Sequence, residues 1–399
     1  MSEQVVEPRM RGFISLTAHP DGCALNVRRD VELVQSRTPE GAEQAIGNAL
    51  VIGSSSGYGL GALLTLCFGY GANAIGVCFE KEPTETKTGT GGWYNVVEAH
   101  RLAREQGRRL ETVNGDAFSS EVKERVVEAV RERFGKLDAV VYSLAAPRRV
   151  DPDGTTWSSV LKPIGAPYHG KGFDLRRNEI TELAIDPASE EEAAATVKVM
   201  GGEDWSAWID LLREEDLLAE GCRSVAFSWI GPPYTQQIYR HGTIGKAKEH
   251  LERTALEIDA QLQQALGGNA WVSVNKAVVT QASSAIPVLP IYVSALFRVM
   301  GAHGLDESTT EQMIRLYADH LRPGAEPSVD GERRIRLDDR EMREDVQSEV
   351  RELWERSTTE NFRSLVDYER YQREFDRLFG FAVDGVDYAA PTEVDRTFD

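Results

Sequence analysis

The sequence predicts an α/β fold in which a doubly wound parallel sheet carries helices on both faces. Three observations support this prediction. Short apolar runs rich in β-branched residues alternate with helix-compatible segments, a glycine-rich turn follows the first run, and an acidic residue ends the second. Continuous apolar runs are typical of parallel strands covered on both faces, and such strands need helical crossovers. The chain has 399 residues, enough for this sheet and further segments around it.

The first predicted strand, Ala49 to Ile52, leads directly into the turn Gly53-Ser-Ser-Ser-Gly57-Tyr58-Gly59. The segment 60–68 is apolar and helix-compatible, and Gly69 can end it. Glycines let a backbone approach a pyrophosphate, and a helix N-terminus attracts that anion through its free N–H groups and dipole. The turn therefore predicts a dinucleotide site, and the alternative is a purely structural turn.

The second predicted strand, residues 74–79, ends at Glu80, which follows Gly59 by 21 residues. An acid at this distance can accept hydrogen bonds from the hydroxyls of the adenosine ribose. Glu80 would repel a 2′-phosphate, which favours NADH over NADPH, although Lys81 beside it weakens that preference. The order strand, glycine turn, helix, strand and acid predicts a Rossmann-type dinucleotide-binding half over residues 47–147.

The alternation continues to the end of this half. Helices are predicted at residues 93–106 and 119–134, and strands at residues 113–117 and 137–142. Ser119 or Ser120 is the expected N-cap of the second helix. Asp116 ends the third strand, where it can accept from an adenine amino group. Small residues follow the fourth strand in Ser143-Leu-Ala-Ala-Pro147. They allow a nicotinamide to pack closely, or they form an ordinary strand exit.

Residues 148–187 break the alternation with glycines, prolines and short alternating runs, which predict a β-rich insertion or flap. This insertion is basic within an acidic protein, so an anionic substrate tail could dock there, and a solvated basic face is the alternative. Its basic residues are Arg148, Arg149, Lys162, Lys171, Arg176 and Arg177.

The second half, residues 188–383, again alternates. Ser189 and Glu192 have the spacing of a capping box, as do Ser308 and Glu311. Strands are predicted at residues 224–230 and 270–274, and helices at 284–300, 340–355 and 361–378. Residues 384–399 are expected to form a loosely packed tail, and the whole chain is expected to be one enlarged domain.

The composition excludes several classes of protein. A formal net charge of −19 argues against nucleic acid as the main partner, because the chain has no excess of basic charge for phosphates. The four cysteines lie far apart, which predicts buried thiols in a reducing compartment and neither a disulfide nor a metal site. The first ten residues lack the apolar core of a signal peptide, and the longest apolar run, residues 285–297, is too short for a membrane span. We expect a cytoplasmic protein.

One stretch, Ile238-Tyr-Arg-His-Gly-Thr-Ile-Gly-Lys-Ala-Lys248, places a tyrosine before two lysines. The apolar positions that follow form one stripe of a helix at roughly 100° per residue. Lys248 falls at the edge of that stripe, and Lys246 falls on the opposite, solvent face. A lysine on an apolar face needs a partner, either a carboxylate such as Glu252 or a group of the cofactor.

Tyr239 precedes Lys248 by nine residues, so on one continuous helix the two side chains would diverge. Gly242 and Gly245 predict instead that Tyr239 lies in a turn before the helix, with Thr243 or its neighbour as the cap. Tyr234 is a competing candidate, but its Gly-Pro-Pro context predicts a rigid turn.

These residues resemble the trans-2-enoyl-CoA and enoyl-acyl-carrier-protein reductases of the FabV/TER type, which are large relatives of the short-chain dehydrogenases. The resemblance covers nearly the whole chain. Its motifs are Arg11-Gly-Phe-Ile with Thr17-Ala-His-Pro, Gly53 to Gly59, Lys87-Thr-Gly-Thr-Gly-Gly-Trp-Tyr-Asn95, Tyr142-Ser-Leu-Ala, Pro147-Arg-Arg149, Lys198 to Trp205, Ile238 to Lys248 and Asn275 to Ala282.

The resemblance implies that Tyr239 and Lys248 are the catalytic pair, through a Tyr-x8-Lys signature. It implies cofactor contacts by Gly53, Ser54, Ser55, Ser56, Gly57, Tyr58, Phe79, Glu80, Asp116, Ala117, Leu144, Ala145, Lys248, Ala277, Val278, Val279 and Thr280. Trp229 stands at a substrate position where the family usually has tyrosine, and residues 233–237 also depart from the family pattern. An indole donates one hydrogen bond and cannot accept one, so the acyl-chain preference is left open.

The implied activity is the NADH-dependent reduction of the C2=C3 bond of trans-2-enoyl thioesters, the last reductive step of fatty-acid elongation. The acyl carrier would be coenzyme A or acyl carrier protein, and the enzyme a monomer. Tyr239 would donate to the thioester oxygen, and Lys248 would hold the cofactor. The alternatives are a short-chain-type carbonyl reductase and a non-catalytic NADH-binding protein.

Overall fold

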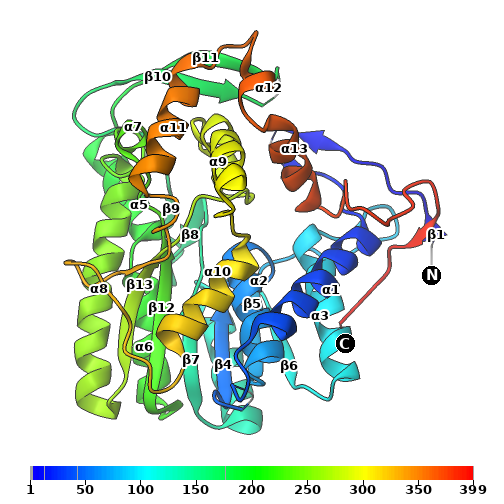
Figure 1. Cartoon of the computed structure of the whole chain (residues 1–399). Coiled ribbons are helices and arrows are strands. Elements are labelled where there is room, and N and C mark those ends of the chain that lie inside the picture. Colours follow the sequence, from blue (N-terminus) through cyan, green and yellow to red (C-terminus); the bar gives the residue numbers. More distant parts are fainter. Residues whose placement is uncertain (1–2, 13, 43, 176, 399) are drawn as a thin grey trace.

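A seven-stranded parallel sheet forms the centre of the protein, in a computed structural model that describes residues 3–12, 14–42, 44–175 and 177–398 (Figure 1). The strand order is β14-β13-β12-β7-β4-β5-β6, and every neighbouring pair is parallel. The strands are β4 (Asn48–Ile52), β5 (Asn73–Cys78), β6 (Leu110–Asn114), β7 (Leu137–Tyr142), β12 (Leu218–Ser228), β13 (Asn269–Val274) and β14 (Ile335–Arg336). The predicted doubly wound α/β fold is confirmed.

The strand order reverses between β4 and β7. The chain winds outward from β4 to β6, returns to β7 and winds the other way to β14. Gly53 follows β4 and Ser143 follows β7, and the two exits touch because the Ser143 N–H donates to the Ile52 carbonyl over 2.8 Å. In open α/β sheets such a switch point at the carboxyl ends of the strands is where ligands bind.

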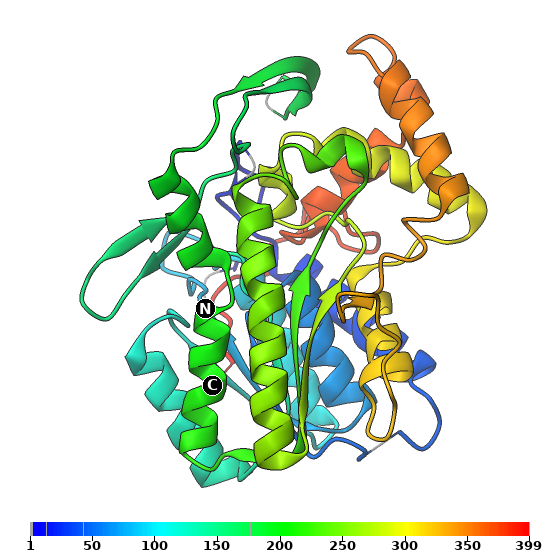
Figure 2. The same ribbon diagram turned by 90° about the vertical axis from the view of Figure 1, so that its left-hand side faces the viewer.

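Helices cover both faces of the sheet (Figure 2). One face carries α1 (Pro20–Arg37), α2 (Gly57–Leu64), α3 (Gly91–Glu105) and α10 (Thr309–Arg315), and the other carries α4 (Ser120–Ala129), α6 (Glu203–Glu214) and α8 (Thr243–Leu266). π-Helical turns extend α2 to Gly69 and α4 to Phe134, the predicted ends of both helices, and another follows α10 (Leu316–Leu321). We did not predict α1, although Val27, Val31 and Val34 recur on its buried face.

The 148–187 insertion forms two antiparallel hairpins, β8 (Arg148–Val150) with β9 (Thr156–Ser158) and β10 (Tyr168–Asp174) with β11 (Glu179–Ile185). The second hairpin lies against the C-terminal helices at the top of Figure 1. Phe173 packs against Phe362 and Tyr368, with ring centroids 5.3 and 4.9 Å apart. Lys171 Nζ donates to the carbonyls of Trp354, Glu355 and Ser357. These contacts fix the hairpin in place.

The remaining helices are α5 (Glu190–Met200), α7 (Pro233–Gln236), α9 (Leu289–His303), α11 (Glu344–Arg356), α12 (Phe362–Leu365) and α13 (Tyr368–Arg377). Both predicted capping boxes are present, at Ser189 and Ser308. The predicted helix 284–300 begins only at Leu289, because the chain first makes a 3-10 turn and an extended residue. The predicted helix 361–378 is broken at Asp367, which caps α13 by accepting from the Arg370 N–H.

The strand predicted at residues 224–230 is observed as the longer strand β12, Leu218–Ser228. It begins at Leu218, and its first part contains Glu220 and Gly221, which gave no apolar signal. The register between β12 and β7 shifts in that part, between Leu218 and Arg223.

The prediction of a loosely packed tail for residues 384–399 is wrong. β15 (Thr392–Glu393) pairs antiparallel with β1 (Glu3–Gln4), which joins the two ends of the chain. Val394 is buried, its carbonyl accepts from the Tyr94 hydroxyl, and the Arg396 carbonyl accepts from Trp93 Nε1. A nearby hairpin of β2 (Met10–Arg11) and β3 (Ile14–Ser15) completes this end of the molecule. Val394 and Phe398 stand alone among polar residues, so their partners cannot be seen locally.

All four cysteines are free and buried, as predicted. No helix in the described part of the chain is long and apolar enough to cross a membrane. Two residues named in the sequence analysis, Phe13 of the N-terminal motif and Arg176 of the insertion, lie outside the described residues.

Candidate active site

The glycine turn forms a cradle at the switch point of the sheet. Gly53 has a positive φ of 87°, and a Cβ atom there would lie 2.0 Å from the Ser143 carbonyl oxygen. A Cβ atom on Gly59 would lie 1.8 Å from the Gly53 carbonyl oxygen. Only glycine fits either position. Ser56 is the N-cap of α2, and its side chain makes no capping bond, which leaves N–H groups of the first turn for an anion. The cradle fits a pyrophosphate.

Glu80, the acid predicted to meet the adenosine ribose, lies beside this cradle and contacts it through Ser55. Its carboxylate accepts from Ser55 Oγ over 2.6 Å and from the Thr90 hydroxyl, and its backbone is bonded in both directions to the Asn114 side chain. The preceding Phe79 ring is 77% exposed. A cavity of about 540 Å³ lies beside these residues, lined by Glu80, Lys81, Glu82, Thr84, Lys87, Thr88, Trp93, Asn114 and Phe398.

Asp116, predicted to meet the adenine, is half-buried in the turn after β6. One of its oxygens accepts from the Phe118 N–H over 3.0 Å, and the neighbouring Ala117 is buried. The carboxylate thus orders its own turn, and its contact with an adenine stays a prediction.

The predicted nicotinamide-side residues also come together at the carboxyl edge of the sheet. The Tyr58 hydroxyl donates to the Lys276 carbonyl over 2.5 Å, which ties the glycine turn to the loop after β13. In that loop Ala277, Val278 and Val279 are buried, and the Thr280 methyl lies 3.4 Å from where a Gly57 Cβ would stand. From the other side the Leu144 side chain lies 3.2 Å from where a Gly53 Cβ would stand, and Ala145 beside it is exposed.

Tyr239 lies in a turn between α7 and α8, as its glycine context predicted. Its carbonyl accepts from the N–H groups of Gly242 and Gly245 over 3.1 and 3.0 Å. Its side chain is buried, and burial raises the pKa of the hydroxyl above its ordinary value. Within the described part of the chain no residue hydrogen-bonds this hydroxyl, so a protonated donor is available there.

Lys248 lies on the buried face of α8, whereas Lys246 is exposed, so the prediction from helical phase is correct. Lys248 Nζ donates to the Phe227 carbonyl over 3.1 Å at the end of β12. Burial lowers the pKa of its amine to about 8, and the charge of Glu252 opposes this shift. Glu252 itself is bonded by both oxygens to Arg240, over 2.8 and 2.9 Å, so the ion pair considered for Lys248 does not form.

The predicted cap of α8 was Thr243 or its neighbour. The N-cap is the neighbour, Gly242, which makes no side-chain bond. The Thr243 hydroxyl instead donates to the Val160 carbonyl and ties the insertion to α8.

Trp229 stands next to Tyr239. The two rings meet edge to face, with centroids 4.6 Å apart and an interplanar angle of 63°. The indole N–H donates to Glu341 over 3.3 Å. Tyr234, the competing tyrosine, lies in the first turn of α7, and its hydroxyl donates to Gln347 over 3.2 Å, so it has a structural partner. Glu341 falls inside the predicted helix 340–355, but α11 begins only at Glu344, so Glu341 lies in the loop before it. The sequence alone gives no sign of its place beside Trp229.

The comparisons with known proteins cover nearly all of the chain. Residues 87–322 match the trans-2-enoyl-CoA reductase catalytic region, residues 5–85 match the NAD(P)H binding domain of trans-2-enoyl-CoA reductase, and residues 329–392 match the enoyl reductase FAD binding domain. The chain belongs to the trans-2-enoyl-CoA reductase family.

Relatives within this family are similar along their whole length. The enoyl-[acyl-carrier-protein] reductase [NADH] of Flavobacterium johnsoniae is 50% identical over 389 residues, 97% of each chain. The Pseudoalteromonas atlantica protein of the same name is 47% identical, over 96% of this chain and 97% of its own. The predicted family, enoyl-thioester reductase class and nicotinamide cofactor are confirmed.

Two solved structures share the fold of this reductase. The trans-2-enoyl-CoA reductase of Treponema denticola in complex with NAD is 47% identical with a TM-score of 0.93, covering 99% of both chains. The corresponding enzyme of Clostridium acetobutulicum in complex with NADH is 38% identical with a TM-score of 0.94, covering 98% of both chains.

A flavin does not fit the region whose family model mentions FAD. The apolar side chains of residues 329–392 fill a core cluster, with Val346, Val350, Trp354, Phe362, Tyr368 and Tyr371 all buried. The cavity beside Glu80 and the cavity at the amino ends of the strands are both lined by residues outside this region. No step of the reaction is therefore assigned to a flavin.

The basic residues of the insertion mostly have structural partners. Arg149 is buried and pairs with Glu203 over 3.0 Å, Lys162 pairs with Glu192 over 2.5 Å, and Lys171 binds backbone carbonyls. Among the described members of the set, only Arg148 and Arg177 are exposed. The structure therefore gives little support to an anion site on the insertion.

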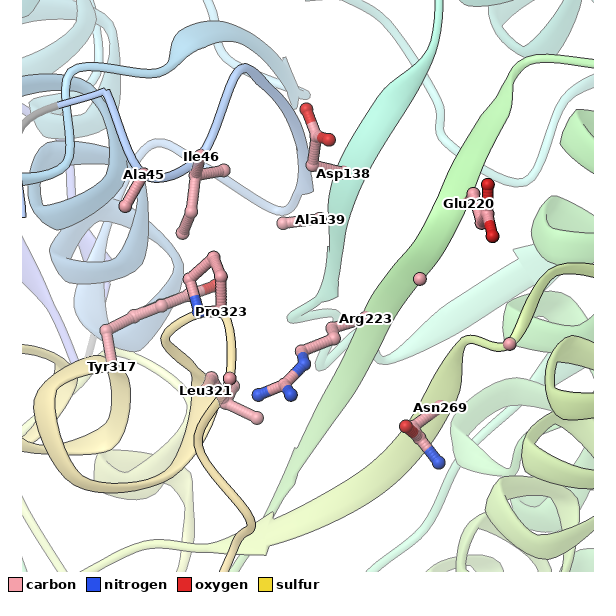
Figure 3. Close-up of a pocket in the computed structure, with 13 residues that line it drawn as sticks. Ala45, Ile46, Asp138, Ala139, Glu220, Arg223, Asn269, Tyr317, Leu321 and Pro323 are labelled. Atoms are coloured by element: carbon pink, nitrogen blue, oxygen red, sulfur yellow. The ribbon is translucent and has the colours of Figure 1, made fainter.

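A second cavity, of about 340 Å³, lies at the amino ends of the strands, opposite the glycine turn (Figure 3). Asp138 at the start of β7 and Asn269 at the start of β13 line it, and the Arg223 side chain extends into it from β12. Arg223 donates to the carbonyls of His320, Arg322 and Ala325, so this cation already has partners. These bonds hold the segment that follows α10 against the sheet.

Proposed function

We propose that this chain catalyses the NADH-dependent reduction of trans-2-enoyl thioesters to saturated acyl thioesters, as the last reductive step of fatty-acid elongation. One observation carries the proposal. A buried tyrosine whose hydroxyl has no partner among the described residues and a buried lysine lie at the carboxyl edge that also holds the glycine cradle. The printed names of the relatives supply both candidate carriers, acyl carrier protein for the curated reductases and coenzyme A for the solved structures.

Tyr239 is the proton donor in this proposal. Bound NADH supplies the hydride that adds to C3 of the enoyl thioester. Negative charge then develops on the thioester oxygen, and the Tyr239 hydroxyl donates a hydrogen bond to it. Because burial raises the Tyr239 pKa, the hydroxyl stays protonated throughout the physiological pH range. A preorganised donor of this kind stabilises the enolate-like transition state.

Lys248 holds the cofactor in this proposal, through a ribose hydroxyl or a phosphate. Its amine carries a charge below about pH 8, where it also biases the tyrosine toward the anion that proton transfer would leave. Glu80 and Asp116 would meet the adenosine, the cradle from Gly53 to Tyr58 would hold the pyrophosphate, and residues 144–145 and 277–280 would enclose the nicotinamide. Trp229 would line the acyl side.

The organisation of the chain follows from these roles. We assign residues 47–147 to cofactor binding, residues 148–187 to an insertion, and residues 188–383 to catalysis and substrate binding, all within one enlarged domain. We also propose a cytoplasmic monomer, in keeping with the four free thiols.

The test is NADH oxidation by the purified protein with trans-2-enoyl thioesters of several chain lengths, each presented on coenzyme A and on acyl carrier protein. Oxidation with enoyl thioesters and none with 3-ketoacyl thioesters is expected. The reverse preference would instead identify a carbonyl reductase. NADH binding without oxidation in any arm would identify a non-catalytic binding protein.

A further inference from the structure

Glu341 lies between the cofactor side and the acyl side of the proposed site. It is completely buried, in the loop that joins β14 to α11. The N–H groups of Leu337 and Asp338 both donate to the Val274 carbonyl, over 2.9 and 3.1 Å. These two bonds fix the loop to the end of β13, so the position of the Glu341 carboxylate is set by the sheet.

The Glu341 carboxylate receives three hydrogen bonds. One oxygen accepts from the backbone N–H of Ala277 over 2.7 Å. The other accepts from Trp229 Nε1 over 3.3 Å and from the Tyr292 hydroxyl. A backbone N–H and an indole N–H can only donate, and an ionised carboxylate can only accept. The ionised form, which prevails above about pH 7, therefore matches all three donors.

Two further contacts connect the Glu341 carboxylate, through its partners, to Tyr239 and to the glycine turn. Trp229 packs edge to face on Tyr239, the proposed proton donor. Ala277 lies in the loop after β13, and Thr280 of the same loop lies against the glycine turn. Gln347 supports the same unit from α11, because its amide donates to the Glu341 carbonyl over 2.7 Å and to the Tyr292 hydroxyl over 3.1 Å.

We propose that Glu341 is a positioning residue for the reaction, whose carboxylate fixes Trp229 against Tyr239 with one oxygen and the 277–280 loop with the other. The acyl side and the cofactor side of the site are then held in register by one buried group. The proposal rests on the proposed function, and it explains how tryptophan is accommodated at position 229, where the indole requires an acceptor.

The test uses Glu341→Gln, which keeps the shape of the side chain but places an NH2 group on one side. If the amide oxygen faces Ala277, the NH2 group opposes the indole N–H of Trp229; if the amide is flipped, it opposes the Ala277 N–H. Either arrangement leaves buried donors unsatisfied, so we expect the NADH dissociation constant to rise on the order of tenfold and kcat to fall. Glu344→Gln, the same substitution at an exposed carboxylate three residues away, is the matched control.

The decisive variant adds Trp229→Phe to Glu341→Gln. Phenylalanine removes the indole donor, so the amide oxygen can face Ala277 while its NH2 group meets the Tyr292 hydroxyl. The double variant is therefore expected to bind NADH within about twofold of Trp229→Phe alone, because the clash of donors is gone. If Glu341→Gln alone does not fold, recovery of a folded, NADH-binding protein in the double variant gives the same support.

Additive losses in the double variant, wild-type NADH binding by Glu341→Gln, or failure of both variants to fold would overturn the proposal. NADH binding is measured by fluorescence titration without an acyl substrate. A failure of the proposed reaction would instead appear in the wild-type protein as absent turnover with every enoyl thioester, so the two failures are distinguishable.

Discussion

The ammonium group of Lys248 donates a hydrogen bond to the carbonyl of Phe227, 3.1 Å away at the end of β12. This contact links the buried face of α8 to the strand that leads into Trp229. It leaves the other N–H groups of the ammonium for a cofactor. Lys246, two residues earlier, points to solvent.

Replacement of Lys248 by alanine is expected to raise the NADH dissociation constant about tenfold, because a buried charged donor to the cofactor is lost. Lys246→Ala removes the same charge from the exposed face and should change NADH binding by less than about twofold. Fluorescence titration of both variants checks this. Equal losses at the two lysines would contradict the assignment by helical face.

The affinity for NADH should decrease as the pH rises above about 8. Burial lowers the pKa of the Lys248 amine to about 8, so its positive charge is lost through that range. Titrations of the wild-type protein and of Lys248→Met, from about two pH units below to about two above the lowered pKa of about 8, measure the effect. The variant has no amine to titrate, and its affinity should lack this decrease.

Replacement of Tyr239 by phenylalanine should lower kcat on the order of 10²-fold or more, as loss of an oxyanion donor does. NADH binding should remain close to that of the wild-type protein, since the ring and its packing on Trp229 are kept. Tyr234→Phe is the matched control, because the Tyr234 hydroxyl already donates to Gln347. Steady-state kinetics with crotonyl-CoA separates the two variants, and a similar loss in both would argue against Tyr239 as the donor.

The stability of the fold should depend on pH through Glu341. Burial raises the pKa of this carboxyl from its ordinary 4.5 to about 7, and the charge of Asp338 adds to the rise. The hydrogen bonds from the Tyr292 hydroxyl and the Ala277 N–H and the charge of Lys276 lower it. The folded chain therefore holds the proton more tightly than the unfolded chain. The resulting stability is fully present below pH 4.5 and is lost as the pH rises through about 7.

Thermal unfolding of the wild-type protein and of Glu341→Gln between pH 4.5 and about 8 measures this contribution, since the amide cannot titrate. The melting temperature of the variant should fall less over that interval. The Glu341 charge also raises the pKa values of the neighbouring Tyr234 and Tyr58 hydroxyls. Burial raises them further, so both tyrosines stay protonated between pH 4.5 and about 8. Parallel curves for the two proteins would show that Glu341 does not titrate there.

Removal of the Phe398 ring should weaken NADH binding without lowering kcat. Phe398 packs on Trp93 with centroids 4.7 Å apart, and both line the cavity beside Glu80. Phe398→Ala should raise the NADH dissociation constant roughly fivefold, the effect of losing one aromatic contact. Leu256→Ala, at a half-exposed position on α8, is the control for a lost apolar side chain. A fall in kcat at saturating NADH would contradict this role.

The parts of the site that could be predicted from the sequence are those built by neighbouring residues. The turn from Gly53 to Gly59 and the acid at Glu80 follow one another along the chain, and the face of Lys248 is fixed by the phase of its own helix. Glu341 could not be found in this way, because it is separated from its partner Trp229 by 112 residues and lies in a loop.

The carboxyl end shows the same limit. Tyr94 and Val394 are 300 residues apart in the sequence, and no local sequence pattern predicts their hydrogen bond. Residues 384–399 are polar enough to suggest a loose tail, yet the side chains of Val394 and Phe398 and the short strand β15 fix the part between residues 392 and 398. Contacts of this kind depend on where the sheet has already brought other segments.

The pairing of β1 with β15 has a consequence for the order of folding. Residues 392–398 supply a strand beside Glu3–Gln4 and, through Phe398, a wall of the cavity next to Glu80. Bringing together segments so far apart in the sequence costs chain entropy, which is recovered only when other contacts have already drawn them close. We therefore expect this wall to form late, after the central sheet and the helices on its faces.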